Sequence, residues 1–297
     1  MPGHCSMHLL TIPLELLRHI LIFCHPCDII AFSLTCRSAH ELVQDGYLWR
    51  QVWHIYSFDD PHFVLAHRQA VGLLTPHVEP LSSDYQWKVQ FTRRMRAELL
   101  ATKKWGHFSS LPSQDKKAAL ELFVSILEQA SPAGVGRGKL RDLSADIEWA
   151  QRVLSESRLI APGLLSPEDE TEIRELQARI RSGMDEKEWD GETRCGVSDR
   201  RNRSRAFVYD LRNYNYRNDY APHHANGKVN WIHVEYIINV ISSNLQDLPV
   251  HIASPARPPS GLESLRPYSA PGGYSPKDWA GVEGWFAAYS EKLAHDN

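Results

Sequence analysis

The sequence predicts a mainly α-helical protein, in which a small N-terminal domain of three helices precedes a larger, mostly helical domain with a small β element. Three observations predict this fold class. Apolar residues recur at helical spacing in most segments of the chain. Only residues 206–211 have the composition of a β-strand, with residue types that alternate along the segment. No repeat with a fixed period is present, which argues against leucine-rich-repeat and propeller architectures.

The first predicted helix starts at Pro13, which suits the first turn because its missing N–H is not needed there. Its apolar side chains form two rows, Leu14, Leu17 and Leu21 on one and Leu16, Ile20 and Phe23 on the next. A helix this apolar must be covered on two sides. Because its own small domain covers only one side, we infer that a partner protein covers the other.

Two further short helices are expected in the same domain. Pro26 ends the first helix, and Asp28 lies where an N-cap belongs, ahead of an apolar run that begins at Ile29. After Gly46, residues 48–53 form another short amphipathic segment. Three short helices in about 45 residues bury little surface, so we expect the domain to depend on association.

Residues 12–52 resemble the F-box motif through its whole length and in its spacing. The residues that carry the resemblance are Ile12, Pro13, Glu15, Leu16, Leu17, Ile20, Leu21, Pro26, Asp28, Ile29, Cys36, Arg37, Glu41, Leu42, Leu48, Trp49, Arg50 and Val52. The resemblance implies docking on the Skp-type adaptor of cullin–RING ubiquitin ligases and, through it, on cullin and RING subunits. We expect the adaptor to contact Ile12, Pro13, Leu16, Leu17, Ile20, Leu21, Pro26, Asp28, Ile29 and Phe32.

The remainder of such a chain normally selects the protein to be ubiquitinated. We predict the F-box at residues 8–56, a mostly helical substrate-recognition domain at 57–248, and an irregular segment rich in proline and glycine at 249–297. Helices are expected at 84–104 (with Trp87, Phe91, Met95 and Leu99 at four-residue spacing), from Ser113, from Ser144, from 166–169 to about Arg181, and at 229–245. Residues 184–205 have the composition of a loop, and residues 206–211 that of a strand.

The second half carries a looser resemblance. Residues 207–214, 229–235 and 278–285 are similar to segments of F-box proteins abundant in mushroom-forming (basidiomycete) fungi. We expect this half to bind the protein to be ubiquitinated. Its receptor face is expected to include an arginine- and tyrosine-rich group, Arg205, Tyr209, Arg212, Tyr214 and Tyr216.

The composition of the chain limits the classes of partner that we expect and indicates its cellular compartment. The formal net charge is −3, with 33 basic and 36 acidic residues, which argues against a general polyanion binder. Five cysteines, four of them within the first 36 residues, do not resemble a secreted disulfide framework. The apolar run from Leu9 to Phe23 is interrupted by Pro13 and charged residues and is too short to span a bilayer. We expect a protein of the cytosol or nucleus with no membrane partner and no cofactor.

A zinc site is the alternative for the N-terminal domain. Cys24, Cys27, Cys36 and His40 are ligands of the kind that tetrahedral zinc prefers. In the interpretation that we favour, Cys24 and Cys36 occupy apolar F-box positions, Cys27 lies in a turn, and all three behave as small hydrophobic residues. We therefore expect no metal site.

No catalytic arrangement follows from the spacing of nucleophiles and bases. Cys195 has cationic neighbours that favour a thiolate, but no histidine partner is identifiable. His223, His224, His233 and Glu235 include possible metal ligands and acid–base groups, yet nothing in their spacing forces them together. We expect a non-catalytic protein.

Basic and aromatic residues interleave between Arg200 and Tyr220, a pattern that can follow phosphates and stack bases. Asp199, Asp210 and Asp219 dilute this charge. We favour a solvated arginine face or a docking site for an acidic peptide over nucleic-acid binding.

The F-box resemblance implies a substrate-recognition subunit of a cullin–RING ubiquitin ligase, which acts by bringing a protein close to the conjugating enzyme. The alternative is an F-box protein that serves as a structural or regulatory binding partner and recruits no ligase. Ubiquitination that depends on the F-box separates the two.

Overall fold

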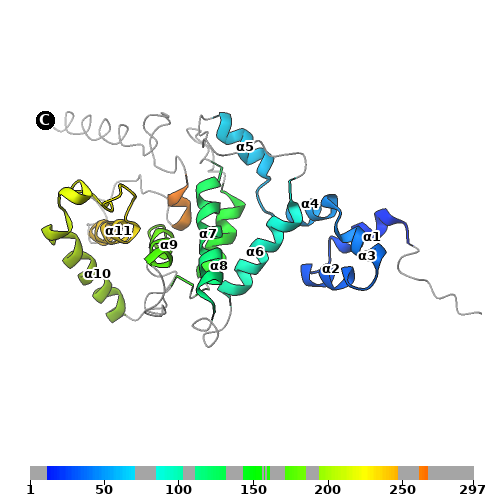
Figure 1. Ribbon diagram of the computed structural model, residues 1–297, viewed down its shortest axis with the longest axis horizontal. Helices are drawn as coiled ribbons and strands as arrows, with labels where there is room; N and C mark the ends of the chain where they lie inside the picture. The colour runs from blue at the N-terminus through cyan, green and yellow to red at the C-terminus, as the bar shows by residue number, and fades with distance from the viewer. Residues whose placement is uncertain are drawn as a thin grey trace, which may run out of the picture. The chain divides into compact units, whose positions relative to one another are not determined.

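The computed structural model of the chain is mainly α-helical, as predicted (Figure 1). It describes residues 12–70, 85–102, 111–131, 143–155, 157, 159–160, 171–184, 194–246 and 261–266. Within these ranges it contains eleven α-helices and no strand, and the one β-type pairing described is an isolated bridge between His223 and Val229. The predicted helix start at 166–169 and the segment 278–285 lie outside the described residues.

The chain divides into two compact units. The first comprises residues 1–63 and 75–95, and the second comprises residues 64–74 and 96–297. The boundaries at residues 56/57 and 248/249 remain predictions. Apart from 261–266, the predicted irregular segment 249–297 lies outside the described part of the chain.

Four short helices begin the first unit, one more than the sequence predicted: α1 (Leu14–Leu21), α2 (Pro26–Ser33), α3 (Arg37–Val43) and α4 (Gly46–Ile55). Pro26 begins α2 rather than ending α1, because proline is favoured in a first turn. The predicted cap Asp28 lies inside α2, and the His25 side chain caps the helix by accepting from Cys27 N. The helix that the sequence analysis missed, α3, is capped by the Cys36 sulfur.

Aromatic side chains fill the core of the first unit. Trp49 and Trp53 of α4 are fully buried. Their rings contact Phe91 and Trp87 of α6 (Trp87–Ala101), at centroid distances of 5.6 and 5.7 Å. Each indole N–H donates to a backbone carbonyl, Trp49 to Val43 at 2.7 Å and Trp53 to Asp59 at 2.9 Å. A buried indole needs such a partner, and its ring then contributes a large apolar area.

The second unit is a series of packed helices: α7 (Ser113–Gln129), α8 (Ala145–Ser155), α9 (Thr171–Arg181), α10 (Arg194–Val208) and α11 (Trp231–Gln246). In this series α11 packs between α10 and α9, and α7 packs between α9 and α8 (Figure 1). The short 3₁₀ helix η5 (Gly261–Leu265) packs against α8. The described helix α5 (Pro61–Ala70) crosses the division between the units.

Sequence signals placed most of these helices correctly. Ser144 caps α8, where its hydroxyl accepts from Ile147 N at 3.3 Å. Helical spacing puts five apolar residues on one face of α7, and all five are buried: Ala119, Leu122, Phe123, Ile126 and Leu127. The predicted end of α9 at Arg181 and the predicted helix at 229–245 also agree with the structure.

The predicted strand at 206–211 is wrong, and so is the predicted loop over the part of 184–205 that begins at Arg194. Helix α10 runs through Val208, and the 3₁₀ helix η3 (Leu211–Asn213) follows. The buried residues Arg200 and Ser204 and the half-buried Phe207 recur at helical spacing. The Phe207 ring contacts His233 and Tyr236 of α11. This packing against α11 overrides the strand propensity of a short aromatic segment.

Candidate functional site

The two apolar rows of α1 have different surroundings beyond Leu14, which starts the first row and is itself 46% exposed. Leu17 is buried, with 3% of its surface exposed, and Leu21 lies beside it in the core. On the next row, Leu16 is 55% exposed and Ile20 is 47% exposed. Phe23, just beyond the helix, is exposed as well, and its ring contacts only the edge of His19 among the described aromatic pairs. One face of α1 therefore belongs to the core, and the other is an apolar surface.

Helix α2 also exposes large apolar side chains. Ile29 is fully buried, whereas Ile30 is exposed and Leu34, its C-cap residue, is 79% exposed. Together with the exposed row of α1, these side chains form what we call the α1–α2 apolar surface, defined as Leu16, Ile20, Phe23, Ile30 and Leu34. Large exposed side chains concentrated in so short a segment are typical of a protein-binding surface.

The ten residues expected to contact the adaptor fall into two groups. Leu17, Leu21, Pro26 and Ile29 are buried, and their side chains hold the helices of the first unit together. The accessible residues are Ile12, Pro13, Leu16, Ile20, Asp28 and Phe32, of which Ile12 and Phe32 are half-buried. Adaptor contact itself stays a prediction for all ten.

Phe23, Ile30 and Leu34 are not among the adaptor contacts that the sequence predicts. The signal for Phe23 was present, because it follows Leu16 and Ile20 at helical spacing. For Ile30 and Leu34 there was no such signal, because α2 is apolar on most of its circumference and sequence alone does not tell its inner side from its outer side.

Local polar contacts hold the helices that display this surface. The Asp45 carboxylate caps α4 by accepting from Tyr47 N at 3.0 Å. The same carboxylate pairs with the Arg18 guanidinium at 2.5 Å, which ties the start of α4 to α1. Because both side chains are only partly exposed, this pair is less screened than an ordinary surface ion pair.

Of the four residues weighed as zinc ligands, Cys27 is exposed within α2, where the sequence predicted a turn, and the other three have another contact. Cys24 Sγ donates to the Ile20 carbonyl at 3.5 Å, and Cys36 Sγ accepts from Ala39 N at 3.5 Å. The His40 ring contacts the Gln44 amide at 3.0 Å. In the described part of the chain, no group of three or more His, Cys, Asp or Glu side chains is arranged to hold a metal ion.

The five residues of the expected receptor face do not all point outward. Tyr209 and Tyr216 are exposed, and Arg212 is exposed while it forms a bidentate pair with Asp210. This pair lowers the pKa of the Asp210 carboxyl, chiefly through hydrogen bonds from Arg212. Tyr214, by contrast, is half-buried, and its ring lies 4.9 Å from that of the buried His233. Arg205 is half-buried and contacts Asn244 Oδ1 at 3.4 Å.

The histidines and acids considered for catalysis have structural partners. Glu235 is paired with Arg181, and His224 Nε2 lies 3.0 Å from Glu175 Oε1. His233 is buried between the rings of Phe207 and Tyr214, and burial lowers its pKa. The Cys195 side chain lies outside the described residues. These contacts build the junction of α9, α10 and α11 in the described part of the chain.

Glu175, which the sequence does not mark as a functional residue, organises this junction. Its second carboxylate oxygen accepts from Trp231 N at 2.7 Å, at the first turn of α11. A carboxylate stabilises the positive end of a helix, and here it comes from another helix. No sequence signal pairs two residues that are 56 positions apart.

Within the described residues, no helix combines the length and the apolarity that crossing a membrane requires.

Comparison with known proteins finds a family model that matches part of the first unit. A family model described as F-box domain matches residues 9–51. No curated protein and no solved structure matches the chain. The resemblance of the second half to basidiomycete F-box proteins therefore stays a prediction. The match and the helices built by these residues support one assignment: the chain carries an F-box domain at residues 9–51.

Proposed function

We propose that this protein is a substrate-recognition subunit of a cullin–RING ubiquitin ligase. Its F-box domain binds a Skp-type adaptor, and the helical body beyond it binds the protein to be ubiquitinated. The chain itself performs no chemistry. It raises the concentration of its bound protein near the conjugating enzyme that the ligase recruits. Its place of action is the cytosol or the nucleus.

The observation that carries the proposal is the α1–α2 apolar surface. All five of its residues fall within the segment 9–51 that matches the F-box domain. A stable protein interface has an apolar centre surrounded by a polar rim. The exposed side chains of Arg37, Glu41 and Asp28 in the same segment are available for such a rim.

Leu16 and Ile20 are the side chains on which we expect the affinity to depend most. They are adjacent along one row of α1, and both keep about half of their surface exposed in the free chain. Truncating a central apolar residue of an interface costs on the order of 2 kcal/mol or more. That cost corresponds to about thirtyfold in affinity for one residue.

The test is direct binding of the full-length chain to a purified Skp-type adaptor, compared with the Leu16→Ala/Ile20→Ala variant. Leu99→Ala/Ile241→Ala is the matched control, because it removes the same atoms from side chains that are 63% and 52% exposed outside the F-box segment. We expect tight binding for the wild type and the control, and a loss of at least a hundredfold in the variant. Circular dichroism establishes that all three proteins are folded.

A folded wild-type chain that does not bind the adaptor would refute the proposal. A second assay addresses the ligase role, namely ubiquitination of a protein captured by this chain in a reconstituted cullin–RING complex. Adaptor binding without ubiquitination that depends on Leu16 and Ile20 would favour an F-box protein with a structural or regulatory role.

A further inference from the structure

The loop between α10 and α11 has an ordered conformation that its own side chains maintain. Asp210 caps η3 by accepting from Arg212 N at 3.0 Å. Asn215 and Asn218 form a reciprocal capping box around η4 (Tyr216–Asn218). The Asn213 amide donates to the Phe207 carbonyl, and the Asn218 amide donates to the Asn213 carbonyl, both at 2.7 Å. These bonds hold the loop in a fixed shape.

This fixed loop displays aromatic and apolar side chains to solvent. Those that are largely exposed are Tyr209, Leu211, Tyr216 and Tyr220. Asp219 and Tyr220 have φ angles of +52° and +56°, in the left-handed region that side chains other than glycine rarely adopt. Backbone strain of this kind is concentrated at functional sites. Exposed tyrosines on a rigid loop provide contact area at a low cost in conformational entropy.

The segment around this loop is basic in an acidic protein. Residues 200–220 contain six arginines and two aspartates, whereas the whole chain has a net charge of −3. Arg203, Arg212 and Arg217 are exposed, and the Arg217 guanidinium lies over the ring of the adjacent Tyr216, 5.7 Å from its centroid. Tyrosine and arginine are the residues most enriched among those that dominate protein-binding energy.

We propose that the loop 209–220, together with the last turns of α10, binds an extended segment of a partner protein that is rich in aspartate and glutamate and carries apolar side chains between them. The inference deepens the proposed function, because this segment would belong to the protein that the ligase modifies. Carboxylates of the segment pair with the exposed guanidinium groups of Arg203 and Arg217. Its apolar side chains cover Tyr209, Leu211, Tyr216 and Tyr220.

The arrangement of charges favours a peptide over a single-stranded nucleic acid. Arg212 is already paired with Asp210, and Asp219 adds a second negative charge on the same loop. A phosphate chain carries a charge at every nucleotide and would meet both carboxylates, whereas a peptide can place apolar residues opposite them.

The experiment measures binding of the full-length chain to an array of twelve-residue peptides. The acidic set alternates glutamate or aspartate with varied apolar residues, and the neutral set replaces each acid by its amide. The Tyr216→Ala/Arg217→Ala variant removes two exposed side chains and keeps the backbone bonds of η4. Tyr47→Ala/Arg93→Ala is the matched control, because it removes an exposed tyrosine and an exposed arginine that lie outside this loop. The single strand dT12 serves as the competing ligand.

We expect acidic peptides to bind at least tenfold more tightly than their amide counterparts, with a tenfold loss in the Tyr216→Ala/Arg217→Ala variant and none in the control. Equal binding of acidic and neutral sets, or binding that the variant leaves unchanged, would overturn the proposal. So would dT12 binding more tightly than every peptide. The assay contains no adaptor, so its failure is distinguishable from failure of the F-box to bind one.

Discussion

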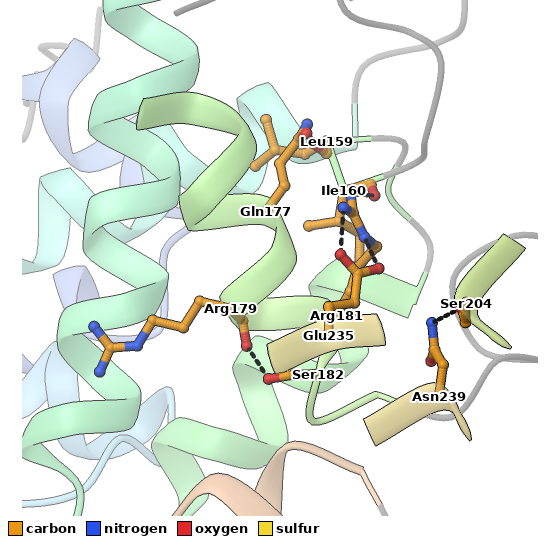
Figure 2. Close-up of polar contacts among 9 residues, drawn as sticks. All are labelled: Leu159, Ile160, Gln177, Arg179, Arg181, Ser182, Ser204, Glu235 and Asn239. Carbon is orange, nitrogen blue, oxygen red and sulfur yellow. Dashed lines mark hydrogen bonds and ion pairs between the residues drawn. The ribbon is translucent and has the colours of Figure 1, made fainter. Parts of the chain in front are cut away.

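Arg181 and Glu235 form a bidentate ion pair that joins the last residue of α9 to the first turns of α11. Arg181 Nε and Nη2 donate to the two carboxylate oxygens at 2.7 and 2.8 Å, and Nη1 donates to the Ile160 carbonyl at 2.9 Å (Figure 2). Both side chains are about nine-tenths buried, at 11% and 10% exposure. Figure 2 also shows Gln177 of α9 donating to the Leu159 carbonyl, at 2.6 Å, so α9 holds the turn at 159–160 by two side chains.

Breaking this pair should destabilise the packing of α9 against α11. In the Arg181→Ala variant, Glu235 stays buried without its cation, and removing one member of a buried pair costs about 3–5 kcal/mol. Because the chain has two compact units, a single unfolding transition is not assumed. The measurement is therefore amide hydrogen exchange in peptides from α9 and α11, which reports the free energy of local opening.

Arg96→Ala is the control for that measurement, because the Arg96–Asp115 pair has similar length but much greater exposure. An exposed pair contributes at most about 1 kcal/mol. Similar losses of protection in the two variants would contradict the role assigned to Arg181. The Arg181→Met/Glu235→Leu double variant should recover most of the lost stability, because no unpaired charge remains buried.

His233 should make the stability of the α10–α11 packing dependent on pH. Burial lowers its pKa below the ordinary value of 6.5. As the pH falls through 6.5, the unfolded chain binds a proton before the folded chain does, so the free energy of unfolding falls. One proton changes this free energy by at most about 1.4 kcal/mol per pH unit. Above 6.5 the stabilisation is fully present.

The variant that checks this is His233→Phe, which keeps an aromatic ring beside Phe207 and Tyr214. It also removes His233 Nε2, a buried atom with no hydrogen-bond partner among the described residues. We expect hydrogen exchange in α11 at pH 5 and pH 7.5 to differ less in this variant than in the wild type. An unchanged difference would assign the pH dependence to other histidines.

Gly183 should be required by close packing at the end of α9. A Cβ built at this position lies 2.5 Å from Cγ and Cδ1 of Leu265 in η5. Gly183→Ala therefore forces a shift, with an expected cost of about 1–3 kcal/mol. In the Gly183→Ala/Leu265→Ala double variant the two effects should be clearly less than additive, since the clash is removed.

Gly46→Ala is the comparison for Gly183→Ala. No atom lies within 4 Å of the Cβ that it would add, and Gly46 is the first residue of α4. Alanine is a better helix former than glycine, so we expect a gain of up to about 1 kcal/mol. Amide hydrogen exchange in peptides from α4 and α9 distinguishes the two outcomes. A destabilising Gly46→Ala would show that residue 46 needs a backbone conformation that glycine adopts more readily than alanine.

Truncating either of two adjacent leucines of α1 should have different effects, one mainly on the stability of the fold and the other mainly on adaptor binding. Leu17→Ala truncates a buried side chain and should cost about 2–5 kcal/mol. Leu16→Ala truncates an exposed one and should change stability by less than about 0.5 kcal/mol. Hydrogen exchange of α1 measures the stability effect, and adaptor binding should show a direct loss for Leu16→Ala in a fully folded protein. Equal destabilisation by the two substitutions would mean that α1 is covered on both sides by its own chain.

Helical periodicity made the fold class and most helix positions predictable. The apolar spacing of α7, α8 and α11 is local, and it specified the buried face of α7 correctly. Four-residue spacing did not specify the buried face of α6, because residues four apart do not lie in a straight line along a helix. Leu99 follows Trp87, Phe91 and Met95 at four-residue spacing, yet it is largely exposed. Each four-residue step turns by about 40° beyond a full circle, so Leu99 lies about 120° from Trp87.

The sequence by itself determined that this protein is helical and that its first 52 residues carry the F-box pattern, because helix spacing and motif spacing are properties of neighbouring residues. Only the tertiary structure decided that Phe207 lies in a helix, that Tyr214 points inward, and that Leu16 is exposed while Leu17 is buried. Such outcomes depend on contacts between segments far apart in the chain, as between Arg181 and Glu235. Packing free energy at those contacts exceeds local preference and selects the final conformation.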